Sequence, residues 1–480
     1  MGATHEVTNQ VPPLVGHDPI AGDAALAEAC VRHADAAALE SLARLGRLAG
    51  SEQAQEWGRL ANENPPKLRT HDRYGHRIDE VEFHPSWHEL MRTAVGNGLA
   101  GAPWAAADAG DGHAHVRRAV GYVGWSQVEM GHGCPVTMTY AAVPALRRSP
   151  ALAARFEPGL TATAYQFGLA EPTGKAGLIA GMGMTEKQGG SDVRANSTRA
   201  APSGDAWEIT GHKWFCSYPP CDVFLTLAQT AAGLSCFLIE GSDPGFRIQR
   251  LKDKLGTRSL PSSELEFHGV RGRLVGEEGR GVATIIRMVN HTRLDCLIGS
   301  AASMRFGVAQ AVHHARHRSA FGRVLAEQPL MRNVLADLAL ESEAATAVAL
   351  RVARAYDEGD APFRRIATAV MKHYVCKRAP GHAAEALECL GGNGYVEESG
   401  MPRLYREAPV NSIWEGSGNV NALDVLRALA KGGRGQDPRE AFFAEVDLAA
   451  GADARLDAFV TGLRDEFADM GSIEMRARRI

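Results

Sequence analysis

The sequence predicts a mainly α-helical protein with an inserted β domain. Apolar residues recur every three or four positions over long stretches in both halves of the chain, which is the pattern of packed amphipathic helices. Between these stretches, short runs rich in β-branched and aromatic residues alternate with Gly, Pro and Asp, as strands and turns do. We therefore expect an α-helical N-terminal domain over residues 1–180, a central antiparallel β domain over 181–280, a C-terminal four-helix bundle over 281–430 and a short C-terminal extension over 431–480.

The N-terminal domain is expected to be helical because its periodic segments are rich in Ala and Leu. These segments run over residues 23–110 and resume from 113 to about 174. A polar stretch at 62–83 interrupts them, and it predicts an ordered loop with a short extended piece.

Six apolar runs predict the strands of the β domain, at residues 207–217, 222–230, 234–241, 246–256, 262–270 and 272–278. Four periodic stretches then predict the helices of the bundle, at residues 281–315, 328–358, 362–390 and 418–431. The remaining residues predict a Gly-containing linker followed by one or two amphipathic helices.

Composition excludes several classes of protein. With 45% hydrophobic and 22% charged residues, the chain matches an ordered globular protein and not a disordered one. The formal charge of −4 gives no overall attraction to nucleic acid, and no apolar run is long enough to span a bilayer. The eight cysteines include no CxxC pair and the N-terminus lacks a signal-peptide pattern, so we expect a cytoplasmic protein. His313, His314 and His317 share a predicted helix without further ligands, so no metal is expected.

Two motifs near the start of the β domain are candidates for cofactor binding. Residues 183–192 are GMTEKQGGSD, a Gly-rich turn that can bring backbone N–H groups close to a phosphate or a flat ring. This turn is neither GxGxxG nor a Walker loop, so nicotinamide- and ATP-binding folds are not indicated. Residues 212–217 are HKWFCS, a predicted strand whose aromatic residues suit either the core or the wall of a cofactor site.

Two further motifs follow the β domain. Residues 388–395 are ECLGGNGY, where a predicted helix ends at a Gly cluster, as many helices do. Residues 411–419 are NSIWEGSGN and place Glu415 beside Trp414 in a Gly-rich turn. A Glu beside Gly is usually a solvated loop residue, but burial against an indole would raise its pKa and make it a stronger base.

Together these motifs resemble the signatures of the acyl-CoA dehydrogenase flavoproteins, and more closely those of their AidB-like, adaptive-response branch. The first motif is similar to the family's G-M-T-E-x-x-G-G-S-D throughout. Residues 318–322, RSAFG, resemble its R-x-x-F-G, with Gln328 at a familiar distance. The likeness covers about residues 10–430. The residues that match the family's second signature are Glu388, Gly391, Gly392, Gly394, Tyr395, Glu398, Arg403 and Glu407.

The resemblance implies a helical–β–helical fold, non-covalent FAD and a homotetramer. It implies that Arg318 and the Gly391–Gly392 turn reach the flavin of a neighbouring subunit, and that Glu415 is the catalytic base. The cofactor-binding residues that it implies are Met184, Thr185, Gly190, Ser191, Phe215, Cys216, Ser217, Arg318, Ile413, Trp414, Ser417 and Asn419.

The resemblance also implies a reaction, the α,β-dehydrogenation of an acyl-CoA thioester. Glu415 would remove the α-proton while the β-hydrogen leaves as hydride to the flavin N5. Some family members carry the base on an earlier helix, but residues 290–295 contain Asp295 and no Glu, which favours Glu415. Arg293 is a candidate either for shaping the site or pairing with a carboxylate, or for packing between helices. Trp414 stands where ordinary members tend to have Tyr, so the resemblance leaves the identity of the acyl chain open. It also leaves the identity of the electron acceptor open.

Two alternative functions remain open at this stage. The AidB-like branch includes a member linked to DNA binding and to defence against alkylating agents, a function that needs a basic surface. Residues 431–480 carry eight Lys or Arg and ten Asp or Glu, a net charge of −2, so DNA is not the favoured partner. The other alternative is a flavin oxidase or oxygenase that acts on a small molecule without CoA.

Overall fold

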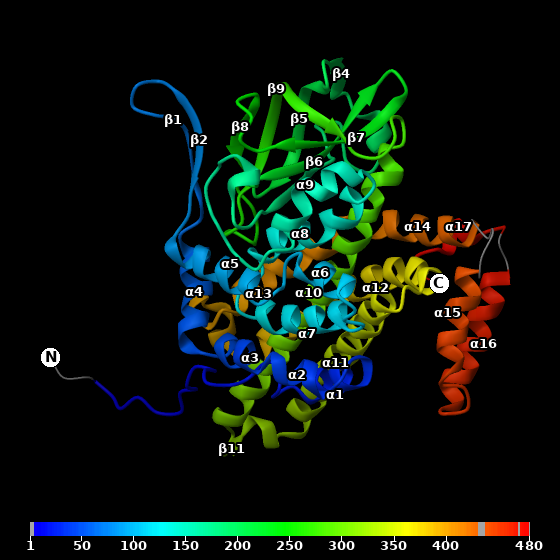
Figure 1. The fold of residues 1–480 in the computed structure, drawn as a ribbon. Coiled ribbons are helices and arrows are strands. Elements are labelled where there is room, and N and C mark those ends of the chain that lie inside the picture. The colour runs from blue at the N-terminus through cyan, green and yellow to red at the C-terminus, as the bar shows by residue number, and fades with distance from the viewer. Residues whose placement is uncertain (1–3, 431–436, 469–470, 480) are drawn as a thin grey trace.

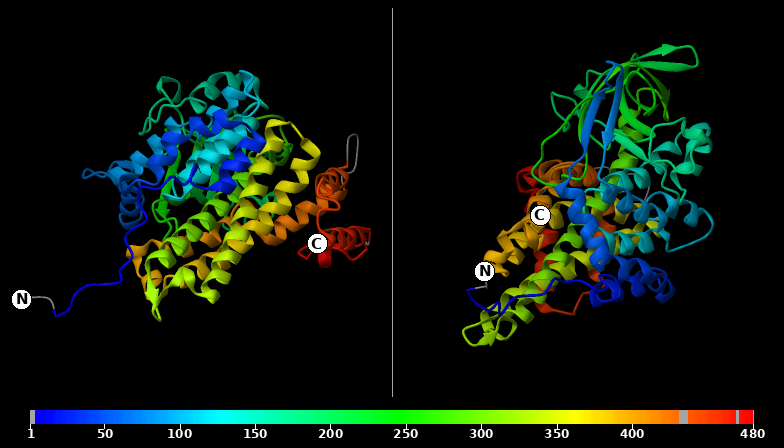
Figure 2. Two further views of the ribbon diagram at one scale, coloured as in Figure 1. Left: turned by 90° about the horizontal axis from the view of Figure 1, so that it is seen from below. Right: turned by 90° about the vertical axis from the view of Figure 1, so that its left-hand side faces the viewer.

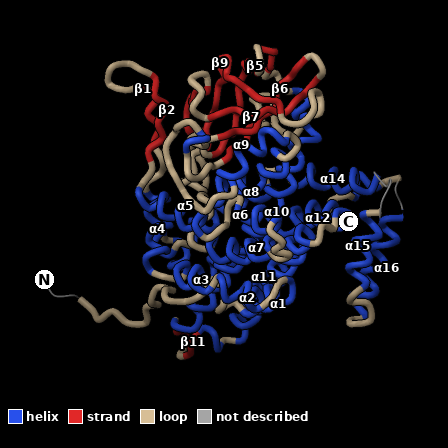
Figure 3. The backbone as a smooth tube through the Cα atoms, viewed as in Figure 1, coloured by secondary structure: helices blue, strands red, loops and turns tan. Residues whose placement is uncertain are grey.

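The computed structural model describes residues 4–430, 437–468 and 471–479. Its chain is first helical, then β, then helical again, which confirms the predicted fold class (Figure 1). The strands of the β domain gather at one end of the molecule, and helices from both flanking regions fill the rest (Figure 3).

The N-terminal region is a layer of short helices around two buried ones. α7 and α8 are buried along nearly their whole length. α8 is apolar on every face, whereas the buried Arg118 of α7 pairs with Asp295. Asp23, Asp35 and Ser51 cap three of the helices by accepting the N–H of the residue three positions on. The helices are α1 Ala24–His33, α2 Ala36–Ser41, α3 Ala43–Ala49, α4 Glu52–Glu63, α5 Pro85–Gly96, α6 Ala102–Asp108, α7 Ala114–Ser126, α8 Gly133–Leu146 and α9 Pro150–Leu160.

Within the polar stretch at 62–83, residues 67–82 form a β-hairpin, where the sequence predicts a loop with one short extended piece. Strands β1 (Lys67–His71) and β2 (Arg77–Glu82) pair antiparallel across a turn in which Asp72 accepts the N–H groups of Tyr74 and His76. The hairpin stands beside strand β8 of the β domain (Figures 1 and 2). There the N–H of Ile248 donates to Asp79 Oδ2 at 3.0 Å, and Arg77 Nη2 donates to the Ile248 carbonyl at 2.6 Å.

The helices of the N-terminal region end earlier than the sequence pattern predicts. α9 ends at Leu160 and not near residue 174, and the chain to Ile179 is mostly loop with one short 3₁₀ turn, Pro172–Gly174. Pro172 and the glycines at 168, 174 and 177 account for this, because they do not sustain a helix.

The β domain is one sheet that closes on itself. Around the ring the strands are ordered β6, β4, β5, β9 and β7, with β7 pairing back to β6. β3 pairs with the first half of β6, on the same edge as β4, and β8 pairs with β9. Most pairs are antiparallel, but β3 and β4 run parallel to β6. The strands are β3 Ala180–Gly183, β4 Arg199–Ser203, β5 Ala206–Ser217, β6 Val223–Thr230, β7 Gly233–Glu240, β8 Phe246–Leu251 and β9 Ser262–Leu274.

The strand predictions therefore need two corrections. Residues 272–278 form no separate strand, because the run that starts at Ser262 continues through Gly269 and Gly272 to Leu274 as a single strand. β3 and β4 were not expected, since AGMG and RAAPS lack the β-branched and aromatic residues that mark a strand. Their place in the sheet comes from pairing with β6 and β5.

The C-terminal helices agree with the predicted stretches to within a few residues. α10, α11 and α12 pack along one another, and α14 packs against α12. They place the turn at residues 413–417 beside the middle of α10 and α12, which positions the candidate site. The helices are α10 Gly281–His317, α11 Pro329–Asp357, α12 Ala361–Glu388, α13 Met401–Glu407 and α14 Gly418–Ala430.

The C-terminal extension adds α15 (Pro438–Asp447), α16 (Ala454–Ala468) and the short α17 (Ile473–Arg476), as seen beside the bundle in Figure 1. Most of the predicted linker, residues 431–436, lies outside the described residues. Within the described part of the chain, no helix is both long and apolar enough to cross a membrane, and no group of three or more His, Cys, Asp or Glu is placed to hold a metal ion.

Candidate active site

Glu415 occupies a sharp turn just before α14. Its φ is +58° and that of Gly416 is +101°, so two successive residues are left-handed. For a residue with a side chain this conformation costs about 1–2 kcal/mol, and contacts of the surrounding chain must offset that cost.

The Glu415 carboxylate is directed at α10. The hydroxyl of Thr292 donates to Glu415 Oε2 at 2.7 Å. Burial raises the pKa of Glu415 above its ordinary value, although the Thr292 hydrogen bond and the positive charges of Arg293 and Lys372 oppose the rise. A raised pKa makes this carboxylate a stronger base than one in water.

Two cations hold the backbone around Glu415. Lys372 Nζ of α12 donates to the carbonyls of Trp414, at 2.9 Å, and Gly416, at 2.6 Å. Arg293 Nε of α10 donates to the carbonyl of Glu415 at 2.9 Å. Three consecutive carbonyls that no helix or strand satisfies are thus bound by buried cations.

Arg293 is itself held by a carboxylate on α14. Its Nη1 lies 2.7 Å from Asp424 Oδ2, and Arg365 of α12 contacts both oxygens of the same Asp424 at 3.0 and 2.8 Å. Burial would raise the pKa of Asp424, but the two guanidinium groups outweigh it and lower that pKa. Arg293 therefore joins the Glu415 turn to α14, and these contacts support its interpretation as a residue that shapes the site.

On the side of the β domain, the GMTEKQGGSD loop is organised around Glu186. This carboxylate is fully buried, 2.9 Å from Lys213 Nζ of β5, and also accepts the N–H groups of Ser197 and Thr198. Lys213 and these hydrogen bonds lower the pKa of Glu186 to about 2 against the opposing effect of burial. The ion pair fixes the loop to β5, so Met184, Thr185 and Gly190 lie at the strand that carries Phe215 and Ser217.

The predicted cofactor-binding residues near this loop differ in exposure. Phe215 and Ile413 are 56% and 63% exposed, and Ser191, Ser417 and Asn419 are also exposed. Met184, Thr185, Gly190, Ser217 and Trp414 are partly buried. The Cys216 side chain is fully buried in the core of the β domain, and this burial raises the pKa of its thiol to about 12. Its side chain is therefore not part of the open surface.

Cys134, at the start of α8, links the two sides of the site. Burial raises the pKa of its thiol to about 12, with a hydrogen bond to Ser217 opposing and the charge of Glu415 adding to the rise. Ser217 of β5 thus acts on this thiol through a hydrogen bond, and Glu415 acts on it through its charge.

Arg318 lies elsewhere, at the C-terminal end of α10. Its guanidinium donates to the backbone carbonyl of Asn9, and the Asn9 side chain bonds both the N–H and the carbonyl of Ser319. Phe321 on the same loop is 98% exposed, and its φ is +54°. Among the described residues, no hydrogen bond or ion pair joins Arg318 to the Glu415 turn of the same chain, so the structure does not bring these two predicted site residues together.

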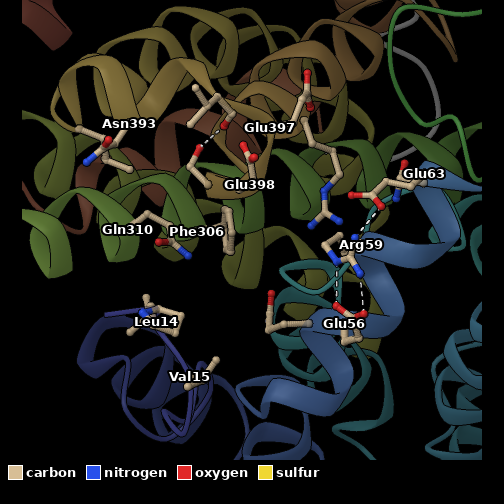
Figure 4. A pocket seen from close by; sticks show the side chains of 18 of the residues that line it. Leu14, Val15, Glu56, Arg59, Glu63, Phe306, Gln310, Asn393, Glu397 and Glu398 are labelled. Carbon is tan, nitrogen blue, oxygen red and sulfur yellow. Dashed lines mark hydrogen bonds and ion pairs between the residues drawn. The ribbon is translucent and has the colours of Figure 1, made fainter. Parts of the chain in front are cut away.

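Three residues of the second signature line a separate cavity of about 1050 Å³ (Figure 4). Its walls are the N-terminal segment around Leu14, α4, α10 and α13. On α4, Arg59 pairs with Glu56 and Glu63 at 2.6 and 2.5 Å. Glu398, Arg403 and Glu407 of the signature are among the lining residues, whereas the Glu415 turn is not. Burial raises the pKa of Glu407 to about 7.

Sequence reasoning missed Thr292, Lys372, Asp424 and Cys134. Thr292 lies within residues 290–295, where Asp295 is the one carboxylate, and a lone hydroxyl in a predicted helix does not indicate a partner of the base. Lys372 carried a weak signal, since a Lys within a predicted core helix must find partners if it is buried. Nothing in the sequence connects position 372 with position 415, because the contact exists only after α12 packs on the turn.

Three family descriptions match the chain in order. Residues 9–167 match the adaptive response protein AidB N-terminal domain, residues 181–270 the acyl-CoA dehydrogenase middle domain and residues 279–430 the acyl-CoA dehydrogenase C-terminal domain. AidB of Escherichia coli (strain K12) is 45% identical over 474 residues, which are 96% of this chain and 87% of that relative.

Solved structures show the same similarity. The Bd2924 apo-form has a TM-score of 0.88 and 29% identity, with 99% of this chain and 96% of that one covered. Caenorhabditis elegans ACDH-11 in complex with C11-CoA has a TM-score of 0.86 and 28% identity, with 99% and 83% covered. The chain therefore belongs to the acyl-CoA dehydrogenase family, in the branch that contains AidB.

Proposed function

We propose that this protein is an FAD-dependent oxidoreductase that dehydrogenates an acyl-CoA thioester between its α and β carbons, with Glu415 as the base. The observation that carries the proposal is a partly buried carboxylate of raised pKa, held by Thr292 in a left-handed turn between the β domain and the bundle. Membership of the family supports the reaction class, and the C11-CoA bound to the similar C. elegans protein supports an acyl-CoA as substrate.

The residues around Glu415 fit a flavin. Phe215 and Ile413 are large apolar side chains left exposed beside a polar loop, and a flat ring system would cover them. Ser191, Ser417 and Asn419 are exposed and offer hydroxyl and amide groups. We assign the cofactor to these residues together with Met184, Thr185, Gly190, Ser217 and Trp414, while Cys216 contributes only through its backbone. FAD, when bound, supplies the hydride acceptor.

The protein's own part in the reaction is to hold and move one proton. Glu415 begins ionised, takes the α-proton on a carboxylate oxygen and becomes neutral. Its environment suits that change, because the burial that raises its pKa also favours the neutral product. Hydrogen-bond donors at the thioester carbonyl would stabilise the developing enolate.

We further propose a homotetramer in which Arg318 and the Gly391–Gly392 turn contact the flavin of a neighbouring subunit. Arg318 lies away from the Glu415 turn of its own chain, beside the fully exposed Phe321, and Tyr395 next to the Gly turn is 83% exposed. Exposed aromatic side chains of this size favour a protein contact. The domain boundaries at 180, 280 and 430 and a location in the cytoplasm, in keeping with eight free cysteines, remain part of the proposal.

The test is an anaerobic titration of the purified yellow protein with a panel of acyl-CoA thioesters, followed by the flavin absorbance. We expect one class of thioester to bleach the flavin, and Glu415→Gln to retain the flavin but lose bleaching. Glu407→Gln is the matched control, because Glu407 is a second buried carboxyl of raised pKa outside the site, and it should bleach as wild type.

If no thioester bleaches the flavin while dithionite reduces it normally, the proposal is wrong. Fast reoxidation by air would then favour an oxidase that acts on a molecule without CoA. DNA affinity with a steep dependence on salt would favour the DNA-associated alternative.

A further inference from the structure

The carbonyls of Trp414, Glu415 and Gly416 need hydrogen-bond donors from outside their own turn. They precede α14 and lie outside its hydrogen-bond ladder, and the left-handed conformations of Glu415 and Gly416 turn them toward α10 and α12. Carbonyls removed from water cost free energy unless they accept hydrogen bonds. Each of these three accepts one from a cation.

Lys372 is the most unusual of these partners. Its side chain is buried, with the residue 1% exposed, and it forms no salt bridge among the described residues. A buried ammonium without a carboxylate partner is expensive. Two of its three N–H donors are directed to the carbonyls on either side of Glu415, at 2.9 and 2.6 Å.

We propose that Lys372 is a positioning residue for the base: by holding the carbonyls of Trp414 and Gly416 it keeps Glu415 in the left-handed conformation that directs its carboxylate toward Thr292. Arg293 completes the arrangement at the carbonyl between them. The proposal rests on the proposed function in one respect, since it takes Glu415 as the reacting group.

The arrangement has a clear physical purpose. A misplacement of a catalytic group by about 1 Å can lower a rate about 100-fold. A left-handed Glu would relax to a right-handed or extended conformation if its neighbours allowed it, and the carboxylate would then leave Thr292. Lys372 acts on the two flanking peptide groups, so it restrains the backbone on both sides of the residue that must stay in place.

Two variants of Lys372 and one matched control separate this role from general stability. Lys372→Met has a similar length and no donors, and Lys372→Arg keeps the charge and the donors. Lys175→Met is the control, because the Lys175 side chain is also buried, 2% exposed, but pairs with Asp222 beside β3 and forms no hydrogen bond to the turn among the described residues. All three are measured as flavin-loaded protein by hydrogen exchange of peptides covering residues 413–419 and by the rate of flavin reduction.

We expect Lys372→Met to exchange these amides about tenfold faster than wild type. We also expect about 100-fold slower flavin reduction at unchanged thioester affinity. Lys372→Arg should recover most of both, and Lys175→Met should change neither. Unchanged exchange in folded Lys372→Met, or equal loosening in Lys175→Met, would overturn the proposal.

The two readouts keep this proposal separate from the proposed function. If no thioester reduces the wild-type flavin, the assignment of the reaction fails, but exchange at residues 413–419 still decides whether Lys372 restrains the turn. If Lys372→Met does not fold, Lys372→Gln replaces it, because its amide is uncharged and one bond closer to the backbone, so it cannot bind both flanking carbonyls as Lys372 does. Wild-type exchange in Lys372→Gln would count against the proposal in the same way.

Discussion

Thr292 Oγ1 lies between two acceptors, 2.7 Å from Glu415 Oε2 and 2.9 Å from the carbonyl oxygen of Val289. A hydroxyl has one proton, so it donates to only one of them at a time. When Glu415 is ionised, the stronger bond is the charge-assisted one to the carboxylate. When Glu415 is protonated it can donate to Thr292, and the hydroxyl then donates to Val289. The same hydroxyl therefore serves Glu415 before and after proton transfer.

Replacing Thr292 by Val should raise the pKa of Glu415 further, because the bond to the ionised form is lost. The base must be ionised to react, so the acid limb of the pH–rate profile should move to higher pH and the rate at pH 7 should fall. Stopped-flow flavin reduction between pH 5 and 9 measures this. Thr292→Ser keeps the hydroxyl and should follow wild type; coincident profiles for Val and Ser would refute the role of the hydroxyl.

Glu407 should make the protein less stable as pH rises. Burial raises its pKa from 4.5 to about 7, and its Oε1 has no hydrogen-bond partner among the described residues. Its contribution to stability is therefore fully present below pH 4.5 and is lost as pH rises through about 7. Glu407→Gln stays neutral, so it should be more stable than wild type by about 1–3 kcal/mol at pH 8.5. It should show no such gain at pH 4.5. Thermal unfolding at both pH values checks this, and an equal shift at both would contradict it.

Asp424→Asn should destabilise the bundle strongly. It removes the carboxylate that neutralises both Arg293 and Arg365, and breaking a buried ion pair costs about 3–5 kcal/mol. Asp453→Asn is the control, because its pair with Arg455 is exposed to solvent. Denaturant unfolding of both variants makes the comparison. A similar small change in the two would mean that the Arg293–Asp424–Arg365 network contributes little.

Glu186→Gln should release the GMTEKQGGSD loop and with it the flavin. The buried Lys213 ammonium would lose its anionic partner, 2.9 Å away, and the N–H groups of Ser197 and Thr198 would lose a charged acceptor. We expect a lower flavin content after purification and weaker FAD binding. Flavin content equal to that of wild type would show that the loop holds its conformation without this pair.

The long elements could be predicted from the sequence and the short ones could not. α10, α11 and α12 carry 28 to 37 residues each, long enough for the helical periodicity to identify them. β3 has four residues of small side chains, and its pairing with β6 fixes it. The hairpin at 67–82 is mostly exposed, so it shows too little apolar alternation to be recognised.

The candidate site divides in the same way. Glu415 and the Gly-rich loop belong to contiguous motifs, which a sequence displays directly. Lys372 and Thr292 are single residues inside long helices, separated from Glu415 by 43 and 123 positions. Only the packing of α10 and α12 on the turn brings them together.

The hairpin that stands against β8 also affects how these molecules behave when crowded. The outer side of an edge strand offers free N–H and C=O groups, and a strand of another molecule can add to them and start aggregation. On β8, the N–H and carbonyl of Ile248 are already taken by Asp79 and Arg77 of the hairpin. Because these partners are side chains, they offer no new row of backbone N–H and C=O groups to a further strand. They therefore block the addition of a strand from another molecule at Ile248 without adding a strand to the sheet.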